Sequence, residues 1–412
     1  MVDPNRIARW ALAASVLVLL ADPAWAEPVD DGALSKLHIE PLVDARLRME
    51  AVDQNGLEAQ ALTLRIRGGA EAKLGRLSLL GEVEATVAAL DNYNAFPFAI
   101  ADDQWRTRYA VIADPRNLEL NRLQLQYRSA DVIVTAGRQR INLDDQRWVG
   151  SVGWRQNEQT FDALRGEAKL GPLAMDLTYA ISQRTIFGTE AGPRSAYRGE
   201  FLFAGVGAKR GPIEAKLFSY LLDYDETFFQ SNSSQTHGGI VIGTFPLGGE
   251  AKLSMRVSYA RQSDYGRNPF NYAADYWSLE SGASISGFNI AAGWEQLGSD
   301  NGRAVQTPMA TLHKFNGWAD LFLVTPAGGL QDTYLTIGKA FNGIKALPGL
   351  NAQVSFHQFD SANGDLEYGT EWDASAGLKL GQVGLLLKYA NYAAEDFGED
   401  TRKLWLQAEW AF

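Results

Sequence analysis

The stretch LWLQAEWAF, from Leu404 to Phe412, decides the fold class of this chain. The alternate positions Lys403, Gln407 and Glu409 carry polar side chains. Successive side chains of a β-strand point to opposite faces, so this alternation predicts a strand with one apolar and one mostly polar face. The apolar face consists of Leu404, Leu406, Ala408, Trp410 and Phe412.

A two-faced strand at this place in the chain favours a transmembrane β-barrel over a soluble domain, whose terminal residues usually fray. A barrel in lipid leaves no open edge, so its last strand must pair with its first. We therefore expect the final strand to pair with a first strand around Ile39 to Met49. That pairing would bring Arg46 and Arg48 near Glu409 and Lys403 on the inner wall.

The final strand also resembles the C-terminal signature of bacterial outer-membrane barrels. This resemblance implies two partners, the lipid of the outer membrane and the barrel assembly machinery, which would engage the strand that ends at Phe412. We expect the protein to reside in the outer membrane of a Gram-negative cell.

The first residues predict export. Arg6 and Arg9 precede an apolar run, and Ala24-Trp25-Ala26 forms a small-residue cleavage site, so residues 1–26 are typical of a cleavable signal peptide. The run is too short to span a bilayer, which takes about 20 residues, and this disfavours an uncleaved anchor. The remaining chain divides into a short periplasmic segment, residues 27–36, and a barrel, residues 37–412.

Composition excludes several functions. The chain has no cysteine, which removes disulfides, thiol catalysis and cysteine-based metal sites. Its net charge of −11 disfavours a nucleic-acid partner. No pair of histidines has metal-ligand spacing and no calcium-binding loop motif occurs, so we expect neither a metal nor a cofactor.

Eight tight turns, rich in glycine, proline and serine, divide the chain into nine intervals. Each interval has room for two strands joined by a longer polar connection. The prediction is an all-β, antiparallel barrel of about 18 strands, with 16 as the alternative, in which short periplasmic turns alternate strictly with long extracellular loops. A secreted β-sandwich is the competing fold. The turns fall at residues 75–76, 129–131, 171–172, 211–212, 246–249, 286–287, 342–349 and 381–382.

A barrel of this size is expected to enclose an aqueous channel. If the apolar positions face lipid, the opposite positions face the lumen and form a stripe of arginines, which favours anions. The alternative is that neighbouring Asp and Glu residues neutralise them. A bulge near Gly137 would reverse Arg138 and Arg140. The arginines assigned by position are Arg46, Arg48, Arg65, Arg67, Arg122, Arg138, Arg140 and Arg165.

Two long intervals are candidates for a constriction or channel mouth. The first, between Leu90 and Leu118, contains Trp105 and Arg106; a plain extracellular loop with a short helix is the alternative. The second covers residues 306–326, and its candidate side chains could instead cap a strand. They are His313, Lys314, Trp318 and Asp320.

Two segments resemble the alginate-export family of outer-membrane porins. They are GRQRINLDDQRWVGSVGWRQNEQTFDALR, Gly137 to Arg165, and ATLHKFNGWADLFL, Ala310 to Leu323. The resemblance implies an 18-stranded barrel and passage of an anionic uronate polysaccharide through an arginine-rich lumen. It implies that the carboxylates of the polysaccharide contact Arg138, Arg140, Arg155 and Arg165, and that Asp162 orients an arginine.

We therefore expect a channel, not an enzyme, that passes anionic polysaccharide, oligosaccharide or small anions by passive diffusion. A general diffusion porin with little selectivity is the alternative. A hydrolase built into the barrel wall is less favoured, because no nucleophile-elbow GxSxG motif is present. An actively driven transporter would need a plug domain, and too few residues precede the first strand to form one.

Overall fold

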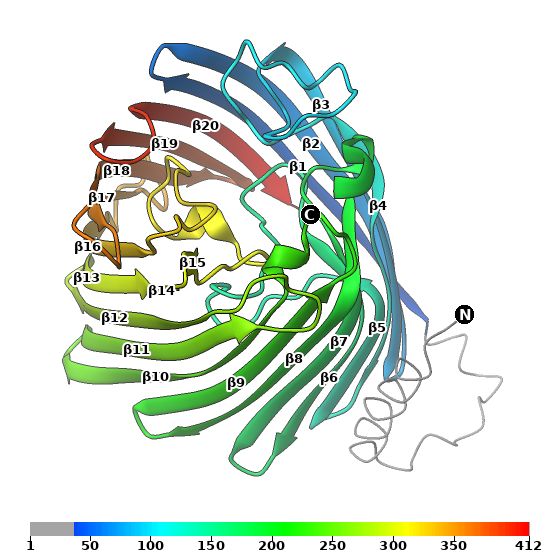
Figure 1. Ribbon diagram of the computed structural model, residues 1–412. Helices are drawn as coiled ribbons and strands as arrows, with labels where there is room; N and C mark the ends of the chain where they lie inside the picture. Colours follow the sequence, from blue (N-terminus) through cyan, green and yellow to red (C-terminus); the bar gives the residue numbers. More distant parts are fainter. Residues whose placement is uncertain (1–36, 412) are drawn as a thin grey trace.

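The computed structural model describes residues 37–411, which form one barrel with loops at both ends (Figure 1). The expected signal peptide, the segment 27–36 and Phe412 lie outside these residues. No helix within the described part of the chain is long and apolar enough to cross a membrane.

Eighteen strands form the wall, each paired antiparallel with its neighbours in chain order, and β1 pairs with β20 to close the ring. The predicted 18 strands are thus confirmed over the alternative of 16 and over the sandwich. The wall strands are β1 (His38–Gln54), β2 (Leu57–Leu74), β3 (Leu77–Asn92), β4 (Asn117–Arg128), β5 (Val132–Gln139), β6 (Thr160–Leu170), β7 (Leu173–Arg184), β8 (Ala196–Arg210), β9 (Ile213–Tyr224), β10 (Ser234–Gly248), β11 (Ala251–Asp264), β12 (Ala273–Ile285), β13 (Phe288–Leu297), β16 (Leu330–Ala340), β17 (Asn351–Asp360), β18 (Glu367–Leu380), β19 (Val383–Ala394) and β20 (Thr401–Ala411).

Short elements occur only in the connections of the described chain. Two of them, β14 and β15, pair as a small hairpin within the β13–β16 loop. These elements are η3 (Thr189–Arg194), η4 (Gln230–Asn232), β14 (Ser299–Asp300), β15 (Arg303–Ala304) and η5 (Leu312–Lys314).

The eight predicted turns all join wall strands, but the strict alternation of short and long connections fails at two places. The predicted turn at residues 342–349 lies in the connection 341–350, which is longer than the predicted long loops 361–366 and 395–400. The other place is the first hairpin. Only Asn55 and Gly56 separate β1 from β2. Both have positive φ, 48° and 84°, as the twist-matched two-residue turn of a β-hairpin requires. Asn-Gly between two alternating runs is a strong hairpin signal. The expected long polar loop is thus a two-residue turn.

The outer face of the wall is apolar, as the alternation predicted. Among its exposed side chains are Leu79, Leu123, Leu217 and Leu406, which are 52%, 48%, 66% and 47% accessible. Lipid would cover this belt in a membrane.

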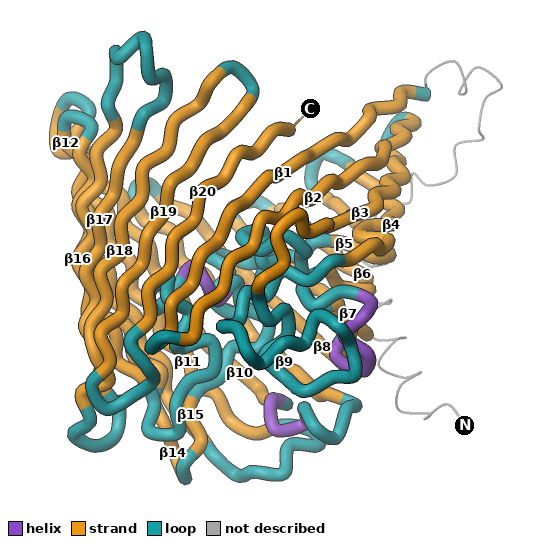
Figure 2. The backbone as a smooth tube through the Cα atoms, turned by 90° about the horizontal axis from the view of Figure 1, so that it is seen from above, coloured by secondary structure: helices purple, strands orange, loops and turns teal. Residues whose placement is uncertain are grey.

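The inner face differs from the expected polar lining. Aromatic side chains on several strands, such as Phe203, Tyr220 and Tyr276, are buried in one large apolar cluster with loop residues Val149 and Met309. Figures 1 and 2 show why, since two long loops fold back inside the ring of strands. These loops supply apolar partners on the lumen side, so burial replaces solvation there.

The seam between β1 and β20 has the predicted register in part. Arg46 lies directly opposite Glu409, and their side chains form an ion pair of 2.7 Å. Arg48 lies opposite Gln407. Lys403 lies further along the strand, opposite Val52, and does not contact either arginine in the described structure.

Candidate channel constriction

Two long loops meet inside the barrel. One is the β5–β6 loop, residues 140–159, and the other is the β13–β16 loop, residues 298–329. Val149 and Met309 form an isolated parallel β-bridge between them. The Gln159 side chain reinforces it by donating to the Met309 carbonyl at 2.9 Å. These loops contain most of the two segments that carry the family resemblance, so the structure joins motifs that lie far apart in the sequence.

Arginines of the wall hold the β5–β6 loop in place. Nη1 of Arg46 donates to the carbonyl oxygens of Gly153, Trp154 and Arg155, at 3.0, 3.0 and 3.1 Å. Nη2 of Arg48 donates to the Trp154 carbonyl at 2.6 Å. A buried carbonyl without a partner is costly. Guanidinium donors therefore replace the strand pairing that this irregular segment lacks.

Carboxylates also pair with Arg155 and with every arginine that the structure places in the lumen stripe, and this is the neutralisation that we gave as the alternative. Arg48 and Arg65 have no accessible surface at all. The pairs are Arg46 with Glu409, Arg48 with Asp114, Arg65 with Asp44, Arg67 with Glu84 and Glu158, Arg122 with Glu82, Arg140 with Glu82 and Glu158, Arg155 with Glu50 and Asp320, and Arg165 with Asp176 and Glu167.

Three of these arginines remain partly accessible. The side chains of Arg140, Arg165 and Arg122 are 31%, 17% and 15% exposed. Arg122 and Arg140 share the carboxylate of Glu82, which is only 5% exposed. Solvent in the lumen therefore meets the guanidinium side of this cluster more than its carboxylate side.

Arg138 and Asp162 do not belong to the lumen stripe, contrary to the expectation from the resemblance. Arg138 lies opposite Leu123, whose side chain is on the lipid-facing side of β4. Gly137 has a φ of 111°, but the register of β5 against β6 is unbroken up to Gln139, so Arg138 keeps the outward direction of Val134. Arg140 follows the strand end and turns inward with the loop. Asp162 does accept two hydrogen bonds from an arginine, as expected, at 2.8 and 3.1 Å from Arg138.

His313 and Asp320 lie at the centre of the constriction. The His313 ring stacks on Trp154 with 4.6 Å between ring centroids and 6° between planes. Its Nδ1 is 2.7 Å from Oδ1 of Asp320, and its Nε2 is 2.7 Å from Nζ of Lys388. The same ammonium group lies 3.6 Å from the ring centroid of Trp318. Three of the predicted mouth residues are thus brought together with a tryptophan of the other loop.

Burial lowers the pKa of His313 well below its ordinary value, and the repulsion by Lys388 adds to this although Asp320 opposes it. The neutral ring then donates from Nδ1 to Asp320 and accepts from Lys388 at Nε2. Burial would raise the pKa of Asp320, but the hydrogen bond from His313 and the charges of Lys403 and Arg155 hold this pKa well below the usual range. Lys403 and Arg155 contact its Oδ2 at 3.1 and 2.7 Å.

The other predicted mouth residues lie elsewhere. Trp105 and Arg106 belong to the β3–β4 loop, where Trp105 is 38% exposed and Arg106 pairs with Asp91 at 2.9 Å. The Lys314 ammonium donates to the backbone oxygen of Asp145 at 2.8 Å. The β3–β4 loop reaches the constriction instead through Asp114, which accepts from the Gln156 backbone N–H at 2.8 Å.

Sequence reasoning missed three further contributors, Asp114, Lys388 and Trp405. Trp405 is fully buried and lies edge-on to Trp154, at 5.8 Å between centroids. It has the lumen-facing position in the final strand, and that alternation alone could have identified it. Among residues 37–411, no cluster of three or more His, Asp or Glu side chains is arranged to hold a metal ion.

The closed ring of 18 antiparallel strands, crossed inside by two loops, defines an outer-membrane β-barrel of the porin type. Residues 63–233 match the family described as alginate export, which confirms the resemblance for the first of the two segments, Gly137 to Arg165. No curated protein matches the chain.

Solved structures share the fold at low sequence identity. OccAB4 of Acinetobacter baumannii has a TM-score of 0.72 at 12% identity, over 91% of this chain and 98% of that one. OpdO of Pseudomonas aeruginosa has a TM-score of 0.70 at 14% identity, over 91% of this chain and 97% of that one. OpdK of Pseudomonas aeruginosa, solved with vanillate, has a TM-score of 0.68 at 13% identity, over 90% of this chain and 98% of that one. At such identities these likenesses concern the fold.

Proposed function

We propose that this protein is a passive channel for anionic polysaccharide, oligosaccharide or small anionic solutes, similar to the alginate-export porins. One observation carries the proposal. Around Glu82 the guanidinium groups of Arg122 and Arg140 reach solvent, while the carboxylates of Glu82 and Glu158 behind them are 5% and 2% exposed. A passing solute meets fixed positive groups first, and a planar guanidinium pairs well with a carboxylate.

A second candidate function is a general diffusion porin with little selectivity. The ion pairing favours it, because each arginine of the lumen stripe has a carboxylate partner. The two candidates differ in whether the accessible guanidinium groups keep an effective positive field in the lumen.

The sign of the reversal potential in a planar bilayer with a salt gradient distinguishes the two candidates. We expect anion preference for the natural protein, and a shift towards zero when Arg122→Gln and Arg140→Gln are combined. Arg261→Gln is the matched control, because Arg261 pairs with Asp275 on the outward side of β11. Cation preference would overturn the proposal, and an unchanged potential in the double variant would favour the general porin.

The substrate class has its own test. Oligouronate added to one side should interrupt the single-channel current more often than a neutral oligosaccharide of equal length. Equal blockade by both sugars would remove the preference for anionic saccharides. The proposal involves no covalent chemistry, and Nε2 of His313, which could activate a hydroxyl nucleophile, faces Lys388 instead.

The route to the membrane is also a proposal. We infer that residues 1–26 are cleaved on export and that the barrel assembly machinery engages the final strand. The intact mass of protein purified from outer membranes should correspond to a chain that begins near Glu27. Deletion of Phe412 should reduce the yield of folded barrel.

A further inference from the structure

A row of residues, polar from β5 to β8, crosses the outside of the wall. Leu123, Arg138, Asp162, Ser182 and Arg198 lie directly opposite one another, in that order, on the five strands β4 to β8. Directly opposed residues of an antiparallel sheet share a face. The first residue, Leu123, is 48% exposed on the lipid-facing side, so the whole row lies on the outer face of the barrel.

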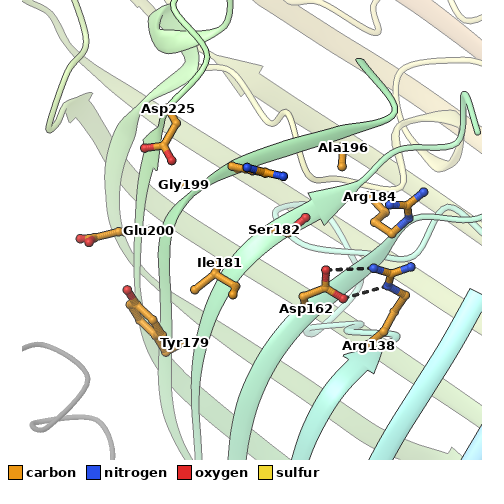
Figure 3. A pocket seen from close by; sticks show the side chains of 11 residues that line it. Arg138, Asp162, Tyr179, Ile181, Ser182, Arg184, Ala196, Gly199, Glu200 and Asp225 are labelled. Carbon is orange, nitrogen blue, oxygen red and sulfur yellow. Dashed lines mark hydrogen bonds and ion pairs between the residues drawn. The ribbon is translucent and has the colours of Figure 1, made fainter. Parts of the chain in front are cut away.

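The row borders a cavity of about 550 Å³ in the outer wall. Figure 3 shows Arg138 and Asp162 pointing toward each other on one side, with Glu200 and Asp225 across from them. A β-bulge that includes Ile181 disturbs the register between β7 and its neighbours at this point. The charged side chains of its lining are Arg138, Arg184, Arg198, Asp162, Glu200 and Asp225.

The cavity lies at the loop end of the wall. Strand β5 ends at Gln139, β7 ends at Arg184 and β8 begins at Ala196, all beside the cavity. The long loops of such barrels are extracellular. Below it the outer face is apolar, as at Leu125 and Leu217, which are 52% and 66% exposed. Charged groups are costly in hydrocarbon, so the cavity belongs to the level of the headgroups of the outer leaflet.

The chemistry of the lining suits a sugar. Three guanidinium groups, which only donate, stand among three carboxylates, which only accept, and Ser182 adds a hydroxyl. A sugar hydroxyl donates and accepts, so it can use both kinds of group at once. A simple anion such as phosphate would meet as many carboxylates as guanidinium groups. The side chains of Tyr179 and Ile181 add apolar surface for the face of a sugar ring.

We propose that this outer-wall cavity binds the saccharide headgroup of a glycolipid in the outer leaflet of the membrane. The sugar hydroxyls bond to the arginines and carboxylates of the lining, and the acyl chains lie along the apolar belt below. This site is independent of the channel function, because it opens away from the lumen.

The test measures glycolipid that stays with the barrel. The full chain is reconstituted in phosphatidylethanolamine bilayers that contain rough-type lipopolysaccharide, extracted in mild detergent and weighed by native mass spectrometry. We expect glycolipid to remain on the natural protein. Asp162→Asn combined with Glu200→Gln should weaken retention about tenfold, since charge-assisted hydrogen bonds are lost. Ala196→Trp should fill the cavity and abolish retention with the polar groups intact.

Two controls keep the result interpretable. Asp275→Asn removes a carboxylate of the ion pair with Arg261, at the loop ends of β11 and β12 on the outer face, and should leave retention unchanged. Heat-dependent gel mobility shows that each variant is folded. The proposal is overturned if phosphatidylglycerol is retained as well as lipopolysaccharide, if the natural protein retains neither, or if folded cavity variants retain as much as the natural protein.

Discussion

Trp154 is the residue at which the two inner loops and the wall meet. Its ring stacks on His313, and the guanidinium carbon of Arg48 lies 4.1 Å from its centroid. The Lys388 ammonium group lies 4.2 Å from the same centroid. Cation–π contacts of buried groups contribute up to about 2 kcal/mol each. The constriction therefore rests on a few aromatic contacts in addition to its ion pairs.

The β13–β16 loop should detach from the wall more often at low pH because of His313. The docked loop lowers the pKa of this ring, so the docked state binds fewer protons than the released one. Its contribution is complete above the ordinary histidine pKa of about 6.5 and is lost as the pH falls below that value. Protonation would place a third cation beside Lys388 and Arg155 and would leave only Asp320 in its favour. Single-channel recordings at pH 7.5 and 5.5 should show more frequent gating events at the lower pH.

The control for this pH effect is His313→Gln, which has no titrating ring. Its gating frequency should change little between the two pH values. A rise as large as that of the natural protein would assign the pH response to another group.

At the scale of elements, the turns set the order of the strands. The Asn55-Gly56 turn fixes β1 against β2, whose paired residues run from His38 with Lys73 to Gln54 with Leu57. If β1 slipped by one residue against β2, the lumen arginines of β1 would turn toward lipid. This two-residue turn thus fixes the direction of Arg46 and Arg48 relative to Arg65 and Arg67.

Replacement of Gly56 by alanine should destabilise the barrel by about 1 kcal/mol, because φ of +84° suits glycine. No atom lies within 4 Å of the added Cβ, so the cost is conformational and not steric. Urea unfolding in detergent micelles measures it. Gly81→Ala is the control, since its added methyl group also meets open space and its φ is not positive. Equal stability of the two variants would contradict the turn argument.

The sequence predicted elements better than their contacts. Glycine and proline turns and alternating runs are local signals, and they located all eight predicted turns between wall strands and the face of each arginine on β1, β2 and β4. The inward course of residues 140–159 and 298–329 has no local signal. It depends on partners such as Arg46 for Gly153 and Gln146 for Thr311, which lie more than a hundred positions apart.

For the whole molecule, the two inner loops determine how much of the barrel is open. Exchange of residues 307–325 for a short Gly-Ser linker should raise the single-channel conductance, because it removes the loop that covers the aromatic inner wall. Planar-bilayer recording measures the change. Exchange of residues 266–271, in the shorter β11–β12 loop, for a linker of equal length is the control and should leave the conductance unchanged. Natural conductance after removal of residues 307–325 would show that they do not limit the flow.

The alternation of polar and apolar residues gave the architecture at this scale, but the charge of the lumen depends on pairing. The alternation shows which arginines face the lumen, whereas the electric field in the lumen depends on which carboxylates lie behind them. Glu82, Glu84 and Glu158 lie beneath Arg67, Arg122 and Arg140 through contacts among β2, β3, β4 and an inward loop. No pattern within one strand reveals such an arrangement.

The seam between β1 and β20 has a consequence for the timing of assembly. Arg46 joins Glu409, 363 positions away, and the same guanidinium group holds the backbone of residues 153–155. Contacts between distant segments form late, since the intervening chain must be ordered first. Until the final strand arrives, Arg46 lacks its carboxylate partner and the edge of β1 is open. Closure of the ring and completion of the constriction are therefore coupled. A barrel that lacks its last strand also lacks contacts that hold the β5–β6 loop in its final position.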